Sequence, residues 1–292
     1  MQVAMTLPTM LPHGRHEATA WCRAIDEGPW SSLAVPERIT YTSHSMIVQL
    51  AAAAALTERV RLWTTIVILP MHSAVDMAKQ LASVDQLSKG RLTVGVGVGG
   101  REHDYRAIGT SFARRWSRLD EQVAEMRRIW AGNPPFDGAD PVGPPPVQPG
   151  GPPFIAGAMG PKSIARAARW AAGVDGAWTL DGNRESVRSA FDTIEAAWVA
   201  AGRDDKPHLS TSIWYALGDD AETRLRRYAY DYLRIFGEDA GKYGAQGVAC
   251  FTPDALRRAV DNIRAAGADE LFLVPTTTDP KELDRTRDAL NI

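Results

Sequence analysis

A glycine-rich stretch at residues 89–100 (KGRLTVGVGVGG) is the first feature of the sequence that could contact a ligand. Its apolar residues alternate with glycines, and the glycines gather toward its end. Glycine carries no side chain, so a ligand can lie directly against its backbone. We therefore expect a flat cofactor to pass close to Gly97 and Gly99, with Val98 between them.

The spacing of Gly95, Gly97 and Gly100 formally matches the Gly-x-Gly-x-x-Gly fingerprint of dinucleotide-binding folds. That fingerprint follows a first strand and opens a helix on its last glycine. Here the stretch follows three earlier strand-like segments and continues into polar residues 101–104 (REHD), which disfavours a dinucleotide site. The remaining alternative is an ordinary glycine-rich strand followed by a loop.

A second candidate is a turn of small residues that leads into a helix with proline at its first position. It comprises Gly157, Ala158, Met159, Gly160, Pro161, Lys162 and Ser163. Free amide groups and the dipole at a helix start favour a phosphate group, and Lys162 and Arg166 add positive charge. The alternative is an ordinary strand-to-helix turn, because proline is common at the first position of any helix.

Two polar side chains, Glu37 and His44, follow the second predicted strand and are candidates for catalysis. A carboxylate there could act as an acid, a base or a hydrogen-bond partner of a ring. The alternative for Glu37 is a surface ion pair with its neighbour Arg38. His44 could transfer a proton, and so could His72, although a loop or capping role is the alternative for both histidines.

Trp178 ends the sixth predicted strand, and we expect it to touch a ligand. Trp63, Trp198 and Trp214 are expected to belong mostly to the core. The acids and the histidine at residues 102–104 lack the spacing of a metal site, so we expect a solvated loop and no metal. No Ser-His-Asp or Cys-His arrangement is recognisable from the order of the residues.

The composition is that of an ordinary globular protein with a large core: 292 residues, 45 % hydrophobic, 23 % charged, with a formal net charge of -2. This near-neutral balance argues against nucleic acid or an anionic membrane as a partner. Cys22 and Cys250 are far apart and are expected to be reduced thiols. We expect a cytoplasmic protein, since the sequence shows neither a signal stretch nor an apolar run of membrane-spanning length.

Strand and helix patterns alternate along the chain. Strands are predicted at residues 3–7, 31–35, 60–69, 92–98, 154–156, 176–179, 209–217 and 270–274, and principal helices at 16–27, 44–56, 74–87, 114–130, 161–172, 185–201, 254–266 and 279–290. Eight strands with eight helices fit a single α/β TIM barrel, and the rival is an open doubly wound sheet. We expect an irregular insertion at about 131–153 and a helical insertion at about 219–247.

The barrel rule places the active site at the carboxyl ends of the strands. This end would carry residues 36–38, 69–72, 98–100, 157–161 and 178–179 among others. The rule therefore gathers most of the candidate residues at one face of the barrel before any motif is considered.

Several segments in order resemble the luciferase-like family of flavin and deazaflavin oxidoreductases. They are residues 33–39 (LAVPERI), 57–62 (TERVRL), 78–85 (AKQLASVD), 88–92 (SKGRL), 118–121 (RLDE) and 152–157 (PPFIAG). The resemblance is strong from about residue 30 to 180 and loose after that. No single motif is unique, but their order and spacing together are specific.

The resemblance implies a TIM barrel that binds FMN or the deazaflavin coenzyme F-420 (F420). The ring would lie over the end of the third strand, where the family often has a non-proline cis peptide; here that maps near Thr65 and Ile66. The phosphate would lie at residues 157–163. Sugar-phosphate dehydrogenases of the family carry Asp-His after the second strand, whereas this chain has Glu37 and Arg38, so that activity is not expected.

Together these observations favour an oxidoreductase that uses F420 to move a hydride to or from a small organic substrate. Members with a similar VPER loop are generally grouped as F420-dependent. The first alternative is an FMN-dependent monooxygenase served by a separate cofactor reductase, and the second is a catalytically silent flavin-binding barrel. A homodimer is implied by the resemblance alone, and no motif identifies the substrate.

Overall fold

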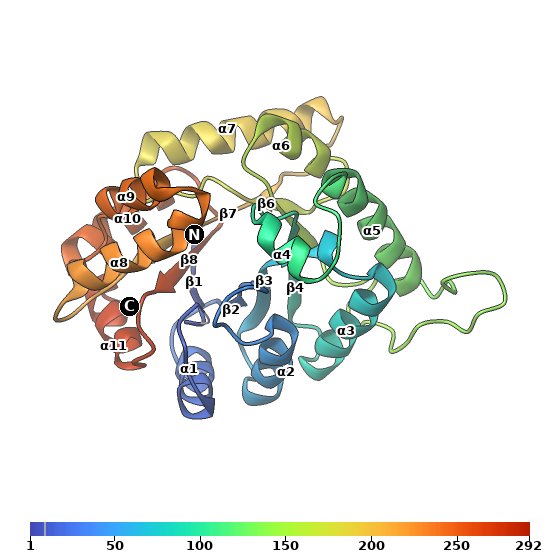
Figure 1. The fold of residues 1–292 in the computed structure, drawn as a ribbon, viewed down its shortest axis with the longest axis horizontal. Coiled ribbons are helices and arrows are strands. Elements are labelled where there is room, and N and C mark those ends of the chain that lie inside the picture. The colour runs from blue at the N-terminus through green and yellow to red at the C-terminus, as the bar shows by residue number, and fades with distance from the viewer. Residues whose placement is uncertain (9) are drawn as a thin grey trace.

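Eight parallel strands close into a barrel in chain order in the computed structural model, which describes residues 1–8 and 10–292 (Figure 1). The strands are β1 (Gln2–Thr6), β2 (Ser32–Val35), β3 (Arg61–Ile68), β4 (Leu92–Gly97), β5 (Phe154–Gly157), β6 (Gly173–Asp175), β7 (His208–Tyr215) and β8 (Glu270–Pro275). Pairing of β1 with β8 completes the ring. The predicted TIM barrel is confirmed, and the open doubly wound sheet is excluded.

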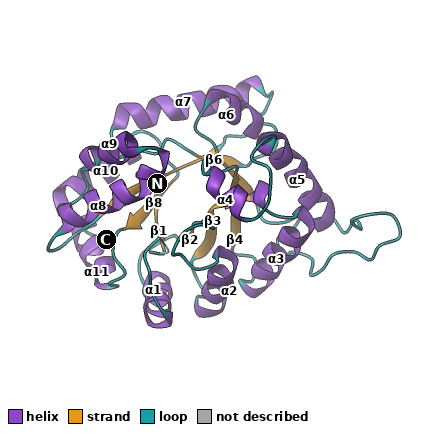
Figure 2. Ribbon diagram, in the orientation of Figure 1, coloured by secondary structure: helices purple, strands orange, loops and turns teal. Residues whose placement is uncertain are grey.

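Helices surround this barrel, as Figure 2 shows. They are α1 (Arg15–Glu27), α2 (Met46–Leu56), α3 (Ala74–Leu87), α4 (Glu102–Ala107), α5 (Arg115–Trp130), α6 (Pro161–Ala167), α7 (Arg184–Ala200), α8 (Ala221–Leu233), α9 (Glu238–Gly247), α10 (Pro253–Ala265) and α11 (Lys281–Leu290), with short 3₁₀ turns η1 (Leu69–Met71) and η2 (Arg234–Phe236). Their apolar faces pack on the strands, whose residues are mostly buried. No helix among the described residues is both long and apolar enough to cross a lipid bilayer.

Segment 131–153 contains neither helix nor strand and extends away from the barrel beyond α3 and α5 (Figure 1). The fully buried Asp85 of α3 fastens its returning end, because its carboxylate accepts hydrogen bonds from the backbone amides of Val147 and Gln148. The other excursion, 219–247, holds α8, η2 and α9. Cys22 and Cys250 are free and buried, and burial raises the pKa of each thiol to about 12.

The predicted sixth strand at 176–179 is wrong, because β6 is the segment Gly173–Asp175. Its register with β7 requires glycine at position 173, where a Cβ atom would lie 2.2 Å from the carbonyl oxygen of His208. The predicted segment cannot be extended, since Ala177 has a φ of 53°, in the left-handed region. Asp175 therefore ends the strand, and Trp178 lies in the loop that follows.

A bulge interrupts β3 beside the glycine-rich β4. The register of the two strands shifts between Thr64 and Val67, and the peptide bond from Thr65 to Ile66 is cis, as the family resemblance implied. A Cβ atom at Gly95 would lie 2.1 Å from the carbonyl oxygen of Thr64, far inside van der Waals contact. Glycine is required there because the backbone of the bulge occupies the space of a side chain.

Gly97, a predicted cofactor contact, serves the same bulge and borders neither of the two cavities described below. The space of its missing side chain is taken by Ile66, whose Cδ1 atom would lie 2.2 Å from a Cβ atom at position 97. Gly99, which has a φ of 61°, is the glycine of this stretch that turns the chain after the strand. Gly95 and Gly97 therefore make room for β3, and only the end of the stretch, at residues 98–100, borders the cavities at the barrel mouth.

We predict that Gly95→Ala lowers the free energy of unfolding by about 1–3 kcal/mol or more, the range for overpacking a filled core. The matched control is Gly143→Ala, where a Cβ atom would meet no atom within 4 Å. Urea unfolding of both variants checks the prediction. Equal stability of the two variants would show that the bulge does not depend on glycine in β4.

Candidate functional site

Two adjoining cavities open at the carboxyl ends of the strands, at the face that the barrel rule selects. One, of about 400 Å³, is walled by Trp178, Trp214, Tyr228, Tyr232, Phe236 and Phe272; we call it the aromatic cavity. The other, of about 800 Å³, is bordered by all of residues 157–163; we call it the loop cavity. Their common border includes Thr65, Ile66, Gly99, Asp175 and Trp178.

The structure brings nearly all of the predicted cofactor contacts together around the loop cavity. Thr65, Ile66, Val98, Gly99, Trp178 and the seven residues 157–163 border it. Gly97 does not, for the reason given above. These segments come from the ends of four neighbouring strands, β3 to β6, and the parallel pairing of these strands places them side by side.

The loop 157–163 ends in the first turn of α6, which begins at Pro161. The Ser163 hydroxyl accepts a hydrogen bond from the Gly160 amide at 3.2 Å and donates one to the Gly160 carbonyl at 2.8 Å. The amides of Lys162 and Ser163, in the first turn, have no partner within the helix. This turn is therefore ordered before a ligand arrives, with free donors beside a lysine.

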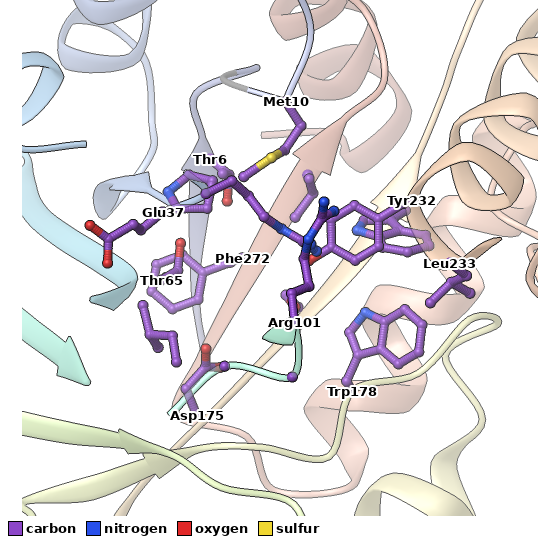
Figure 3. A pocket seen from close by; sticks show the side chains of 18 of the residues that line it. Thr6, Met10, Glu37, Thr65, Arg101, Asp175, Trp178, Tyr232, Leu233 and Phe272 are labelled. Atoms are coloured by element: carbon purple, nitrogen blue, oxygen red, sulfur yellow. The ribbon is translucent and has the colours of Figure 1, made fainter. Parts of the chain in front are cut away.

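Glu37 borders the aromatic cavity, but both of its carboxylate oxygens are already engaged. Oε2 accepts a hydrogen bond from the Ile68 amide at 2.6 Å, and Oε1 lies 2.8 Å from Nε2 of His72. The carboxylate points to one side, away from Trp178 and Tyr232 (Figure 3). Glu37 thus ties the end of β3 to the loop after β2, and the predicted surface pair with Arg38 does not form.

His44, the other predicted catalytic residue, is not brought into either cavity. Its Nε2 atom lies 2.8 Å from the carbonyl oxygen of His13, and the residue lines a separate surface depression formed by α1 and α2. The loop after β2 runs outward before α2 begins at Met46, so nearness in sequence to the strand end does not place His44 at the barrel mouth.

Asp175 is the residue that sequence reasoning missed. It ends β6 and is the one carboxylate, among the described residues, that borders both cavities. Burial raises its pKa to about 6; the Ser210 hydroxyl, 3.4 Å away, opposes the shift, and the negative charge of Glu270 adds to it. A carboxyl group with a pKa near neutrality in a cleft is suited to proton transfer. The correct position of strand six would have revealed it.

Arg38 and Arg101 also border the aromatic cavity. Arg38 lies in the segment 36–38 that the barrel rule placed at this face, whereas Arg101 was not among the predicted site residues. The Arg38 guanidinium lies 4.1 Å from the ring centroid of Tyr232 on α8. The helical segment 219–247 therefore supplies a wall of the site. Its sequence gave no motif for this role, because the contact is made across the barrel mouth between residues far apart in the chain.

A family model described as luciferase-like monooxygenase matches residues 2–277. The chain belongs to the luciferase-like monooxygenase family. The match covers nearly all of the barrel and both cavities, so the resemblance noted at residues 30–180 extends through the C-terminal half.

Curated relatives match only part of the chain. An uncharacterized protein of Mycobacterium tuberculosis is 32% identical over 169 residues, which are 56% of this chain and 58% of the relative. The 4-hydroxyprotoasukamycin monooxygenase of Streptomyces nodosus subsp. asukaensis is 30% identical over 115 residues, 39% of this chain and 28% of that enzyme. The chain therefore spans less than two thirds of the length of these relatives.

Solved structures share the whole fold at lower identity. An F420-dependent secondary alcohol dehydrogenase in complex with an F420-acetone adduct has a TM-score of 0.81 at 19% identity, covering 99% of this chain and 98% of that one. Monooxygenase RslO1 from Streptomyces bottropensis has a TM-score of 0.76 at 24% identity, with 99% and 97% covered. The FMN-bound oxygenating constituent of 3,6-diketocamphane monooxygenase from Pseudomonas putida has a TM-score of 0.75 at 15% identity, with 99% and 96% covered.

We predict that Asp175→Asn stabilises the protein at neutral pH. A carboxyl whose pKa is raised on folding carries a penalty that is complete above the folded value of about 6 and vanishes below the unfolded value near 3.8. The variant should exceed the parent by on the order of 1–3 kcal/mol at pH 7.5 and by little near pH 4. Urea unfolding at both pH values measures this. The control Asp261→Asn, at an exposed ion pair with Arg264, should change little; a D175N effect independent of pH would contradict the assignment.

Proposed function

We propose that this protein is an oxidoreductase that binds F420 in the loop cavity and transfers a hydride to or from a small organic substrate in the aromatic cavity. The observation that supports it most is the common border of the two cavities. The Thr65–Ile66 bulge and Asp175 both lie on that border, so two ligands could meet there.

The residues around the loop cavity fit a flat cofactor that carries a phosphate. Free amides of the first turn of α6 and the Lys162 side chain offer donors and positive charge to a phosphate. At the other end, Thr65, Ile66 and Gly99 offer backbone and small groups against which a ring would lie. Among the described residues, Asp175 is the only acid that borders this cavity, so repulsion of an anion is small.

In this proposal the residues that border the two cavities have separate roles. The bound cofactor supplies the carbon that donates or accepts the hydride. Asp175, beside the ring position, can hold or release the proton that accompanies the hydride. Glu37 fixes the end of β3 and hence the bulge. The aromatic walls keep water from the substrate.

F420 is proposed ahead of FMN because of the VPER loop at residues 35–38. An FMN-dependent monooxygenase receiving reduced flavin from a separate reductase is the second candidate. It is supported by the family description and by the similarity to monooxygenases.

The cytoplasmic location and the homodimer remain proposals. A silent flavin-binding barrel would bind cofactor without turnover of any substrate.

Titration of the purified protein with F420 and with FMN separates these functions. We expect saturable F420 binding, followed by tryptophan and deazaflavin fluorescence, that is at least about tenfold tighter than FMN binding, a difference of about 1.4 kcal/mol. Tighter binding of FMN would favour the monooxygenase. Failure of both cofactors to bind would overturn the proposal.

We also predict that Lys162→Met weakens cofactor binding roughly tenfold through loss of a charged contact worth about 1.5 kcal/mol. Because Lys162 is exposed, the fold should be unaffected. The exposed Lys206, outside both cavities, is the matched control, and Lys206→Met should bind as the parent does. If both variants bind equally well, the phosphate does not lie at residues 157–163.

A further inference from the structure

Two guanidinium groups share one wall of the aromatic cavity. Arg38 follows β2 and Arg101 follows β4, and their Cζ atoms lie 5.9 and 5.8 Å from the ring centroid of Tyr41. Arg38 also lies over Tyr232, and Figure 3 shows the Arg101 side chain extending toward the same ring. Aromatic faces hold both cations in place, because the ring quadrupole attracts positive charge.

The positive charge of this pair is only partly neutralised. Within the described part of the chain, Arg38 forms no ion pair, and its Nη1 atom is buried without a hydrogen-bond partner. Arg101 has one acid nearby, Asp104, at 3.6 Å from its Nε atom, which is likewise buried without a hydrogen bond. Among the described residues, Asp104 is therefore the one acid that pairs with either guanidinium, and it pairs with Arg101 alone.

Other acids near the pair are already engaged elsewhere. Glu37 binds the Ile68 amide and His72, and Asp231 on α8 pairs with Arg227 and Arg234. Burial, followed by the neighbouring Arg38 charge, lowers the pKa of Arg101. The two guanidinium groups repel each other, and each has a buried N–H group without a hydrogen-bond acceptor. An anionic ligand would offset the repulsion and supply the missing acceptors.

The other walls of the aromatic cavity indicate that the rest of the ligand is apolar. Apolar side chains dominate the remaining walls, among them Met10, Trp178, Trp214, Leu233, Phe236 and Phe272. A free inorganic anion would leave this surface without contacts. A volume of about 400 Å³ suits a small molecule with a compact apolar body.

The pair is distinct from the positive charge of the loop cavity. Arg38 and Arg101 border the aromatic cavity and not the loop cavity, whereas Lys162 borders the loop cavity alone. An anion at the arginines therefore belongs to a ligand beside the proposed cofactor phosphate site, not within it.

From these contacts we propose that the substrate is a small apolar or aromatic compound bearing a carboxylate, held by Arg38 and Arg101. Planar guanidiniums bind carboxylates through paired hydrogen bonds, which fixes the orientation of the apolar body toward the Thr65–Ile66 bulge and Asp175. This inference rests on the proposed function, since it names the substrate class of the same site.

The experiment compares carboxylates with their neutral amides on the intact protein. Benzoate, phenylacetate, 2-naphthoate and octanoate, each paired with its amide, are titrated by calorimetry and by quenching of tryptophan fluorescence. We expect at least one carboxylate to bind tenfold or more tightly than its amide. If no carboxylate in the panel is preferred to its amide, the proposal is overturned.

Substitutions test whether Arg38 and Arg101 cause any preference for a carboxylate over its amide. Arg38→Met and Arg101→Met should each remove most of it while cofactor affinity stays unchanged, and Arg38→Lys, which keeps the charge, should retain part. The control Arg114→Met, at an exposed pair with Glu121, should behave as the parent. A preference that survives both methionine variants overturns the proposal.

Cofactor titration distinguishes the remaining outcomes. If Arg38→Met weakens cofactor binding instead, the arginines hold an acidic group of the cofactor, and the substrate assignment is wrong. If the parent binds neither F420 nor FMN yet prefers carboxylates, the arginine site stands and the oxidoreductase proposal fails.

Discussion

The close approach of β3 to β4 is the constraint on which the site depends. Backbone atoms of the bulge lie where the side chain of residue 95 would be, and Ile66 fills the place of a side chain at residue 97. A larger residue at position 95 would meet backbone atoms of β3, and one at position 97 would have to displace the Ile66 side chain. The bulge in turn exposes Thr65 and Ile66 at the mouth of the barrel, where they border both cavities. Glu37 fastens the far end of the same strand through the Ile68 amide.

The charged side chains near this bulge border different parts of the site. Lys162 and the first turn of α6 place donors at one end of the loop cavity, and Arg38 with Arg101 places cations in the aromatic cavity. Between them, Asp175 is held at the border by a strand end, and burial raises its pKa to about 6. Each cavity thus has positive side-chain charge on its border, and an acid with a raised pKa lies on the border that the two cavities share.

The barrel was predictable from the sequence because alternation of buried strands with amphipathic helices is a local property that survives in the fold. The turn at 157–163 was predictable because small residues and proline act locally as well. Strand six was misplaced because Ala177 and Trp178 are apolar, as strand residues often are. The left-handed φ of Ala177, which prevents an extended strand there, cannot be read from the sequence. Asp175 was missed because strand six was misplaced. The contact of Arg38 with Tyr232 could not be predicted, because it joins segments far apart in the chain across the barrel mouth.

A structure of the protein determined with F420 bound tests the central claim most directly. The account predicts a ring in van der Waals contact with Thr65 and Ile66, a phosphate hydrogen-bonded within residues 157–163, and Asp175 facing the ring. A ring bound away from the β3 bulge, or a phosphate held outside residues 157–163, would contradict it.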